Sequence, residues 1–338
     1  VDPLGFTYKI EDYLTAFGGF AGVFTSMALP AAIALSAFEM LLGLCMLFQI
    51  HLKRTAFFIL LFMLVMTPLT LWIALKNPVT DCGCFGDALI ISNWETFYKN
   101  VVLLAFILLI LIFSKQFKQV FLPYFEWIAV LIFIIIGVGI AVYSLRNLPI
   151  IDFLPYKKGV NIPEAMMIPE GEQTDKYETT FIYEKDGLQK EFTLENYPKG
   201  DSTWKFVDQK TVLVSKGYVP PIHDLHIVHE LYGDITEDIL HYEGYTYLLV
   251  MYDVNKASVI GAKKAEEFYQ PYKNSTTKFY ALTASGQEDI ENFRKNTGVT
   301  YPFCQSDPIT LKTMLRSNPG LMLIKNGVIQ GKWSWRNF

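Results

Sequence analysis

Residues 97–113 read FYKNVVLLAFILLILIF, and this stretch decides the fold. Its one charged side chain is Lys99, and every residue after Asn100 is apolar. As a helix, a segment of this kind can cross the hydrocarbon core of a bilayer, which is about 30 Å thick. Comparable apolar segments occupy residues 30–48, 55–75 and 125–145. The sequence therefore predicts a polytopic α-helical membrane bundle with these spans, embedded in the lipid bilayer, in residues 1–145.

Composition agrees with a membrane region joined to a globular one. Hydrophobic residues make up 51% of the 338 residues and charged residues only 18%, which is too apolar for an ordinary soluble protein. The apolar excess lies before Arg146, and the sequence after it is typical of a soluble domain. The net charge of −4 gives no electrostatic reason to expect a nucleic-acid partner.

Charged residues between the spans predict the orientation of the bundle. Basic residues follow the first span at residues 51–54 and the third span at residues 115–118, and loops rich in Lys and Arg stay in the cytoplasm. The slightly acidic loop between the second and third spans, and everything after residue 146, are then expected on the outer side. Residues 8–24 would lie along the membrane surface. Because Val1 would already be outside, a preceding membrane span is also expected.

The loop between the second and third spans contains two cysteines separated by one residue. A disulfide needs Cα atoms about 4.4–6.8 Å apart, which neighbours at this spacing reach only in a bent backbone. Gly83 permits the bend because it has no Cβ. Strained, exposed disulfides tend to be labile or catalytic. The sequence therefore predicts a redox pair with supporting neighbours, in the segment Asp81-Cys82-Gly83-Cys84-Phe85-Gly86-Asp87.

Other interpretations of this pair stay open. It fits a structural clip in a tight loop, or two thiols without a role. Half of a zinc site fits poorly, because tetrahedral zinc takes four ligands and the loop has no histidine, so no metal is predicted. The negative charges of Asp81 and Asp87 argue against a strongly activated thiolate.

The membrane part resembles the MauE/DoxX family of bacterial inner-membrane proteins. The resemblance rests on the cysteine loop with its flanking residues and on the start of the chain, namely Asn77-Pro78-Val79, Trp94, Lys99-Asn100, Asp2-Pro3-Leu4-Gly5-Phe6 and Lys9. Several members of that family are associated with disulfide formation. The resemblance implies the inner membrane of a Gram-negative cell, with the cysteine loop and the C-terminal half in the periplasm. By analogy alone, it also implies a quinone as electron acceptor.

Glu39 is the one ionisable residue well inside the first span. A charged carboxyl in hydrocarbon costs several kcal/mol, so such a residue is a functional candidate by default. It fits a proton relay or a contact to a quinone head group. It fits equally well a neutral side chain hydrogen-bonded to Ser36, Thr67 or Thr70.

The chain beyond the membrane divides into a linker and two folded parts. Residues 146–157 are broken by two prolines and predict the linker. Residues 158–216 predict a small β-rich subdomain, with a hairpin at Lys185-Asp186-Gly187 and two further short strands at 204–207 and 211–214. Residues 217–338 predict strands and helices in β-α-β-α-β-β order, ending in a hairpin at Asn326-Gly327.

This order resembles a membrane-anchored, periplasmic thioredoxin-like domain, with Pro319 at the place of its cis-proline. Active members carry a C-x-x-C motif at the start of the helix after the first strand, where this chain reads Asn255-Lys256-Ala257-Ser258. The domain therefore lacks its own dithiol. Its lone cysteine, Cys304, is typical of a buried small hydrophobe. A thiol partner for the cysteine loop is the alternative.

Two functions fit the whole sequence. The preferred prediction is an inner-membrane thiol–disulfide redox component that acts on a periplasmic protein through Cys82 and Cys84. The alternative is a non-catalytic, membrane-anchored scaffold whose thioredoxin-like domain binds a client protein.

Overall fold

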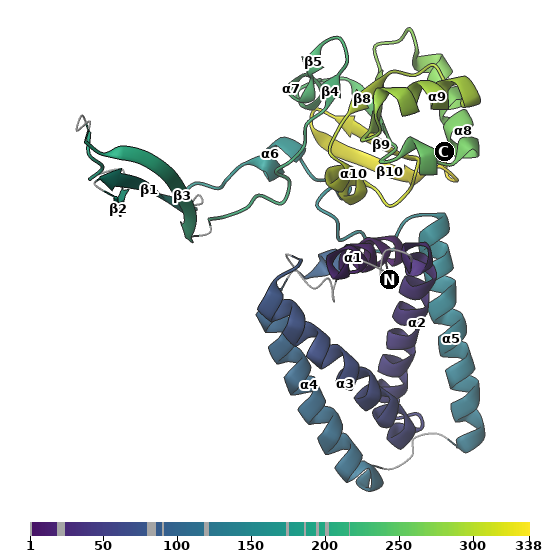
Figure 1. Ribbon diagram of the computed structural model, residues 1–338. Coiled ribbons are helices and arrows are strands. Elements are labelled where there is room, and N and C mark those ends of the chain that lie inside the picture. The colour runs from purple at the N-terminus through teal and green to yellow at the C-terminus, as the bar shows by residue number, and fades with distance from the viewer. Residues whose placement is uncertain are drawn as a thin grey trace. The chain divides into compact units, whose positions relative to one another are not determined.

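The computed structural model describes residues 2–18, 24–79, 86–89, 91–117, 122–173, 176–185, 187–193, 196–199, 203–215 and 217–338 (Figure 1). Contacts divide the chain into two compact units. One unit contains Val1–Val160 together with Leu225–Phe338, and the other contains Asn161–Asp224. The membrane helices and the C-terminal α/β domain thus belong to the same unit. The predicted domain boundaries at residues 145, 157 and 216 stay a prediction.

A membrane bundle forms the N-terminal part of the first unit. Within the described residues, four helices are long and apolar enough to span a membrane, at Phe24–Leu47, Leu52–Lys76, Asn93–Gln116 and Tyr124–Arg146. The α-helical cores of these spans are α2 (Ala28–Leu47), α3 (Leu52–Lys76), α4 (Asn93–Phe113) and α5 (Pro123–Arg146). This confirms the predicted bundle. The spans extend a few residues past the predicted bounds because polar residues continue the helices, as at the capping box formed by Ser92 and Glu95.

An additional helix, α1 (Pro3–Phe17), precedes the spans. Asp2 caps it by accepting a hydrogen bond from the Gly5 amide at 3.0 Å, and Pro3 occupies its first turn. The helix ends at Gly18, whose φ of +65° favours a residue without a Cβ. The expected surface stretch at residues 8–24 is therefore helical as far as Phe17.

Polar contacts join the membrane helices in addition to apolar packing. Helices α3 and α4 pack along each other, as do α2 and α5. Buried Asn100 of α4 donates a hydrogen bond to Thr70 of α3 at 3.1 Å. His51, in the turn before α3, pairs with Glu126 of α5 at 2.6 Å, and Glu126 is 1% exposed. Such pairs satisfy polar groups that lipid cannot.

The α/β domain is built on one mixed sheet, in the strand order β10-β9-β6-β7-β8-β4-β5. Strands β6, β7 and β8 run parallel, whereas β9 pairs antiparallel with β6 and β10 with β9. The strands are β4 (Val228–His229), β5 (Gly233–Asp234), β6 (Tyr245–Val250), β7 (Lys278–Thr283), β8 (Phe303–Gln305), β9 (Gly320–Lys325) and β10 (Val328–Ser334). The helices are α7 (Thr236–Leu240), α8 (Val259–Tyr269), α9 (Gln287–Thr297) and α10 (Pro308–Met314). This topology is thioredoxin-like, as predicted.

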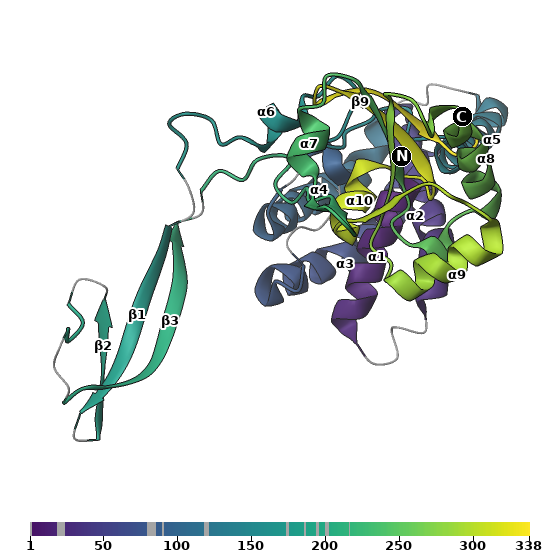
Figure 2. The same cartoon turned by 90° about the horizontal axis from the view of Figure 1, so that it is seen from above.

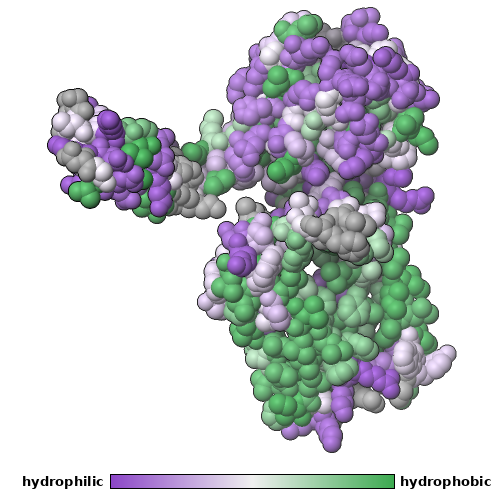
Figure 3. Space-filling model, viewed as in Figure 1, coloured by the Kyte–Doolittle hydropathy of each residue, from purple (hydrophilic) through white to green (hydrophobic). Residues whose placement is uncertain are grey.

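The hydrophobic core of this domain lies between the sheet and helices α8 and α9. It includes Leu249 and Ala281 of the central strands, Ala262 of α8 and Phe293 of α9. The space-filling view in Figure 3 contrasts the polar surface of this domain with the apolar surface of the membrane helices. Strand β8 was not predicted, because a strand of three residues has too few positions to show a periodic pattern.

The second unit contains a short helix, α6 (Ile162–Met166), and an antiparallel sheet in the order β2-β1-β3 (Figure 2). Its strands are β1 (Lys176–Lys185), β2 (Leu188–Thr193) and β3 (Lys205–Ser215). Lys185 pairs with Leu188, which confirms the predicted hairpin. The prediction of two short strands at 204–207 and 211–214 is wrong. Residues 208–210, although polar, pair with β1 and continue a single strand, because cross-strand pairing outweighs low intrinsic propensity.

Candidate functional site

The candidate site is the cis-proline face of the thioredoxin-like domain. The Asn318–Pro319 peptide bond is cis, at the position that the sequence indicated, and it directly precedes β9. The amide of Ser258 donates to the Asn318 carbonyl at 3.0 Å. The side chain of Asn318 donates in turn to the Asp253 carbonyl at 2.8 Å. These bonds tie the proline loop to the segment that leads into α8.

Close packing in this region requires a glycine in the first turn of α8. A Cβ on Gly261 would lie 2.7 Å from Cβ of Trp335 and 3.0 Å from Cδ of Pro319. Real Cβ atoms avoid contacts of this length, so the proline ring and α8 approach each other only because residue 261 has no side chain.

Polar caps replace the dithiol at the start of α8. Ser258 accepts a hydrogen bond from the Gly261 amide at 3.2 Å and so caps the helix. Asp253 accepts from the Asn255 amide at 2.9 Å, and its carboxylate lies 3.6 Å from the Lys256 ammonium. This segment stabilises the helix start and contains no thiol.

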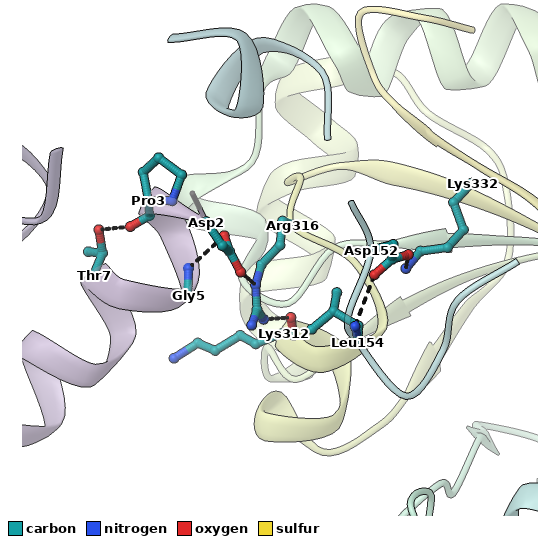
Figure 4. A network of polar contacts seen from close by, with 9 residues as sticks. All are labelled: Asp2, Pro3, Gly5, Thr7, Asp152, Leu154, Lys312, Arg316 and Lys332. Atoms are coloured by element: carbon teal, nitrogen blue, oxygen red, sulfur yellow. Dashed lines mark hydrogen bonds and ion pairs between the residues drawn. The ribbon is translucent and has the colours of Figure 1, made fainter. Parts of the chain in front are cut away.

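Helix α1 contacts this face through an ion pair (Figure 4). Nε of Arg316 donates to Oδ2 of Asp2 at 2.7 Å, and the Arg316 side chain is only 5% exposed. Arg316 also donates to the carbonyl of Lys312 in α10. A Cβ on Gly5 would lie 2.9 Å from the guanidinium, so the glycine allows α1 to approach. Asp2 therefore both caps α1 and anchors it to the domain.

Aromatic rings and cations complete the contact. The rings of Tyr8 in α1 and Tyr252, just past β6, meet edge to face with centroids 6.0 Å apart. The Lys312 ammonium lies 4.6 Å from the Tyr8 centroid and 5.9 Å from that of Tyr252. The Arg316 guanidinium lies 5.6 Å from the Tyr8 centroid. Burial raises the pKa of Tyr8 well above its usual range, so this phenol is neutral at physiological pH.

The opposite end of α1 contacts the membrane bundle. Phe17 stacks on Trp72 of α3, with centroids 4.8 Å apart and planes 21° from parallel. Trp72 lies in the last part of α3, shortly before Lys76 ends that helix. One helix thus joins the cis-proline face to the end of α3 from which the chain enters the cysteine loop.

A second attachment holds the domain where the chain leaves the membrane. Ser334 donates to the Arg146 carbonyl at 3.1 Å, and Lys332 pairs with Asp152 at 2.7 Å. The Lys332 side chain is 6% exposed, and burial lowers its pKa while Asp152 opposes that shift. Residues 159 and 160 then exchange backbone hydrogen bonds with Ile329 of β10.

The cysteine loop itself lies outside the described residues. This applies to Asp81, Cys82, Gly83, Cys84 and Phe85, while Gly86 and Asp87 begin the short 3-10 helix Gly86–Ala88. The described ends of the loop are held together, because Asn93 of α4 donates to the Asn77 side chain at 2.8 Å and to the Val79 carbonyl at 2.9 Å. The Asn77–Asn93 contact therefore defines the base of the loop.

The remaining candidate residues lie in separate places. Glu39 of α2 interacts electrostatically with Lys99 of α4, whereas Thr70 bonds Asn100. Cys304 lies in β8, is 1% exposed, and burial raises its pKa to about 12. Cys45 is also buried, at 4% exposure.

Sequence reasoning missed the contact between α1 and the domain. The residues concerned are Asp2, Tyr8, Tyr252, Lys312 and Arg316. The start of α1 carries a local signal, because Asp followed by Pro is typical of an N-cap and a first helical turn. Nothing local indicates that Asp2 meets Arg316, since the two residues stand at opposite ends of the chain.

Comparison with known proteins finds a family match in the N-terminal part. Residues 5–114 match the family of methylamine utilisation protein MauE. The MauE-like region covers α1 and the first three spans, and α5 follows it. Residues 177–216 match a domain of unknown function, DUF8463, which corresponds to the β1–β3 sheet. No curated protein matches the chain.

Several solved structures are similar to the α/β part. One is a candidate protein disulfide isomerase from Bacteroides thetaiotaomicron, at 18% identity over 34% of this chain and 77% of that protein, with a TM-score of 0.29. Another is StoA from Bacillus subtilis, at 15% identity over 32% and 84% of the two chains, with a TM-score of 0.26. A thioredoxin-family thiol:disulfide interchange protein from Chlorobium tepidum has 11% identity over 32% and 81%, with a TM-score of 0.24.

Proposed function

We propose that this chain is a membrane-bound component of thiol–disulfide exchange in which Cys82 and Cys84 carry the redox step. The observation that carries the proposal is the placement of the other thiols. Of the four cysteines in the chain, Cys45 and Cys304 are buried at 4% and 1% exposure. A thiol must be accessible and partly ionised to exchange, and burial raises the pKa of Cys304 to about 12. The cis-proline face has Asn255 and Ser258 where the two cysteines of a dithiol would stand.

The proposed step transfers two electrons. A thiolate of the partner protein attacks one sulfur of the Cys82–Cys84 disulfide and forms a mixed disulfide. The second partner thiolate then displaces that sulfur. The partner leaves with a new disulfide, and Cys82 and Cys84 become thiols. Reoxidation of the pair would release two electrons and two protons, and a membrane quinone would be the acceptor of both.

The outer side of a Gram-negative inner membrane suits this chemistry. Basic residues follow α2 and α4, which supports placing those ends in the cytoplasm. The loop after α3 and the α/β domain are then both periplasmic. The contacts of the domain with Asp2 and with the carbonyl of Arg146 support this, because both lie at helix ends on the side opposite the basic loops. The periplasm is oxidising and allows the pair to cycle.

The absence of a dithiol also favours a second function. A domain that keeps the cis-proline face without thiols can bind a client without reacting with it. In that case the chain is a membrane-anchored scaffold, and the Cys82–Cys84 pair stiffens its loop.

Replacement of both loop cysteines separates the two functions. Full-length protein in proteoliposomes with a quinone would be given a reduced dithiol peptide, and disulfide formation would be followed by thiol titration. The redox proposal expects Cys82→Ser/Cys84→Ser to abolish quinone-dependent oxidation, whereas the matched control Cys45→Ser/Cys304→Ser retains it. Equal oxidation by the loop variant and the wild type would refute the redox proposal. The scaffold function would be supported if the Cys82–Cys84 pair stayed oxidised in mild reductant and the loop variant oxidised the peptide as fast as the wild type.

A further inference from the structure

We propose that the end of α3 next to His51 binds one acidic phospholipid. Lys53 and Arg54 would hold its phosphate. One of its acyl chains would lie against Phe57 and Phe58, one helical turn deeper in the bilayer. The inference concerns lipid binding, goes beyond the proposed function and does not depend on its redox step.

A groove of about 350 Å³ is present where the start of α3 meets the end of α4. These two helices pack side by side (Figure 1). The groove is lined by Lys53, Arg54, Phe57, Phe58 and Leu111. The two phenylalanines are about half-exposed, and their rings meet edge to face with centroids 6.1 Å apart. Because both helices are long and apolar enough to span a membrane, the apolar part of this groove is accessible to acyl chains.

The order of residues along α3 matches the order of groups in a phospholipid. Lys53 and Arg54 lie in the first turn of the helix, and Phe57 and Phe58 follow them by four residues each. Residues four apart share a helix face and are separated by about 6 Å along its axis. Lysine and arginine near the end of a membrane helix extend toward the polar interface. The cations therefore lie at the level of the headgroups, and the rings lie at the level of the chains.

The charges around the groove favour an acidic headgroup over a neutral one. Both cations are exposed, and in the described parts of the chain no ion pair joins either of them to another residue. Residues 48–58 and 111–126 contain one carboxylate, Glu126. That carboxylate is 1% exposed and pairs with His51 at 2.6 Å, so it does not neutralise the groove. A zwitterionic lipid has no net negative charge, whereas an acidic phospholipid complements two cations.

The turn before α3 fixes the backbone that carries the two cations. The amide of His51 donates to the Glu126 carboxylate at 3.2 Å, and the amide of Arg54 donates to the His51 carbonyl at 2.7 Å. Arginine binds phosphate through a planar fork, and lysine binds it as a point charge. Lipid binding therefore needs to order only the side chains, which lowers its entropic cost.

Native mass spectrometry of the full-length protein tests this site. Protein in detergent would be titrated with phosphatidylglycerol and, separately, with phosphatidylcholine that carries the same oleoyl chains. We expect the first phosphatidylglycerol to bind about tenfold more tightly or better. Lys53→Gln/Arg54→Gln should weaken this binding about 30-fold, because each basic residue near the membrane surface contributes about a factor of five. The matched control Lys76→Gln removes an exposed cation from the other end of α3 and should bind like the wild type.

Three further comparisons separate a lipid site from general attraction of anions. The charge-preserving variant Lys53→Arg/Arg54→Lys should retain selective binding. Leu111→Trp places a larger side chain in the groove without changing its charge, and it should weaken binding about fourfold or more, which corresponds to one displaced CH₂ group. Glycerol 3-phosphate, which has the phosphate without the chains, should not displace the lipid.

Several results would overturn the proposal. These are equal affinities for the two lipids, equal losses in Lys76→Gln and in Lys53→Gln/Arg54→Gln, unchanged binding in Leu111→Trp, or displacement of the lipid by glycerol 3-phosphate. None of these measurements requires a thiol, so their failure is distinct from failure of the cysteine variant in the quinone assay.

Discussion

Removal of the Asp2 charge should release α1 from the α/β domain while its helix cap remains. Asn caps helices about as well as Asp, so Asp2→Asn keeps the bond from the Gly5 amide and removes the ion pair with Arg316. Breaking a buried pair costs about 3–5 kcal/mol. Asp2 is 27% exposed, and Arg316 keeps the Lys312 carbonyl and the Tyr8 ring. We therefore expect Asp2→Asn to weaken the attachment of α1 by about 2 kcal/mol, which is in the lower part of the range for hydrogen bonds to charged groups.

Hydrogen exchange measures this loss directly. A local opening that becomes easier by about 2 kcal/mol exchanges about 30-fold faster. We expect this acceleration in the amides of α1 and in residues 312–320, with the strands β6 and β7 unchanged. Asp12→Asn serves as the control on the same helix. Identical exchange of α1 in Asp2→Asn and wild type would show that the ion pair does not hold the helix.

The other predictions concern single sites in the α/β domain. Gly261→Ala should lower the free energy of unfolding by about 1–3 kcal/mol, measured by chemical denaturation, because its Cβ would press on Trp335 and on Pro319. Cys304 should resist maleimide at pH 8 until denaturant is added, since it is 1% exposed with a pKa of about 12; rapid labelling of native protein would contradict its burial. Hydrogen bonds from Thr236 and then His226 hold the pKa of Asp234 at about 2, below the unfolded value near 4, so its stabilising effect is present above about pH 4 and lost between pH 4 and 2. Asp234→Asn should flatten the acid limb of a pH-dependent unfolding curve, and an unchanged limb would count against this origin.

Elements with strong local patterns could be predicted closely from the sequence. The apolar spans are visible because lipid requires about twenty apolar residues in a row. Helix α8 belongs to the predicted β-α-β-α-β-β order, and a serine cap at Ser258 and apolar residues at helical spacing, Ala262, Ala265 and Tyr269, mark it. The hairpin at Asn326-Gly327 follows from a dipeptide that readily adopts positive φ at both positions.

Features that depend on distant partners could not be predicted in the same way. Strand β3 is continuous because β1 supplies hydrogen bonds to its polar middle, and those partners lie about thirty residues away, as Gln209 and Phe181 show. The buried position of Arg316 depends on a carboxylate at the other end of the chain. The absence of a dithiol at the start of α8 is visible in the sequence. The contact of α1 with the neighbouring residues Tyr252 and Arg316 is not.

The attachment of the α/β domain at both Asp2 and Arg146 limits how it can move. A globular domain joined to the membrane by one flexible linker can rotate freely and reach far from the lipid. A domain attached at two separate points loses most of that rotational freedom. A domain attached in this way stays close to the helix ends that carry Asp2 and Arg146, so a protein that binds it would have to come to the bilayer surface.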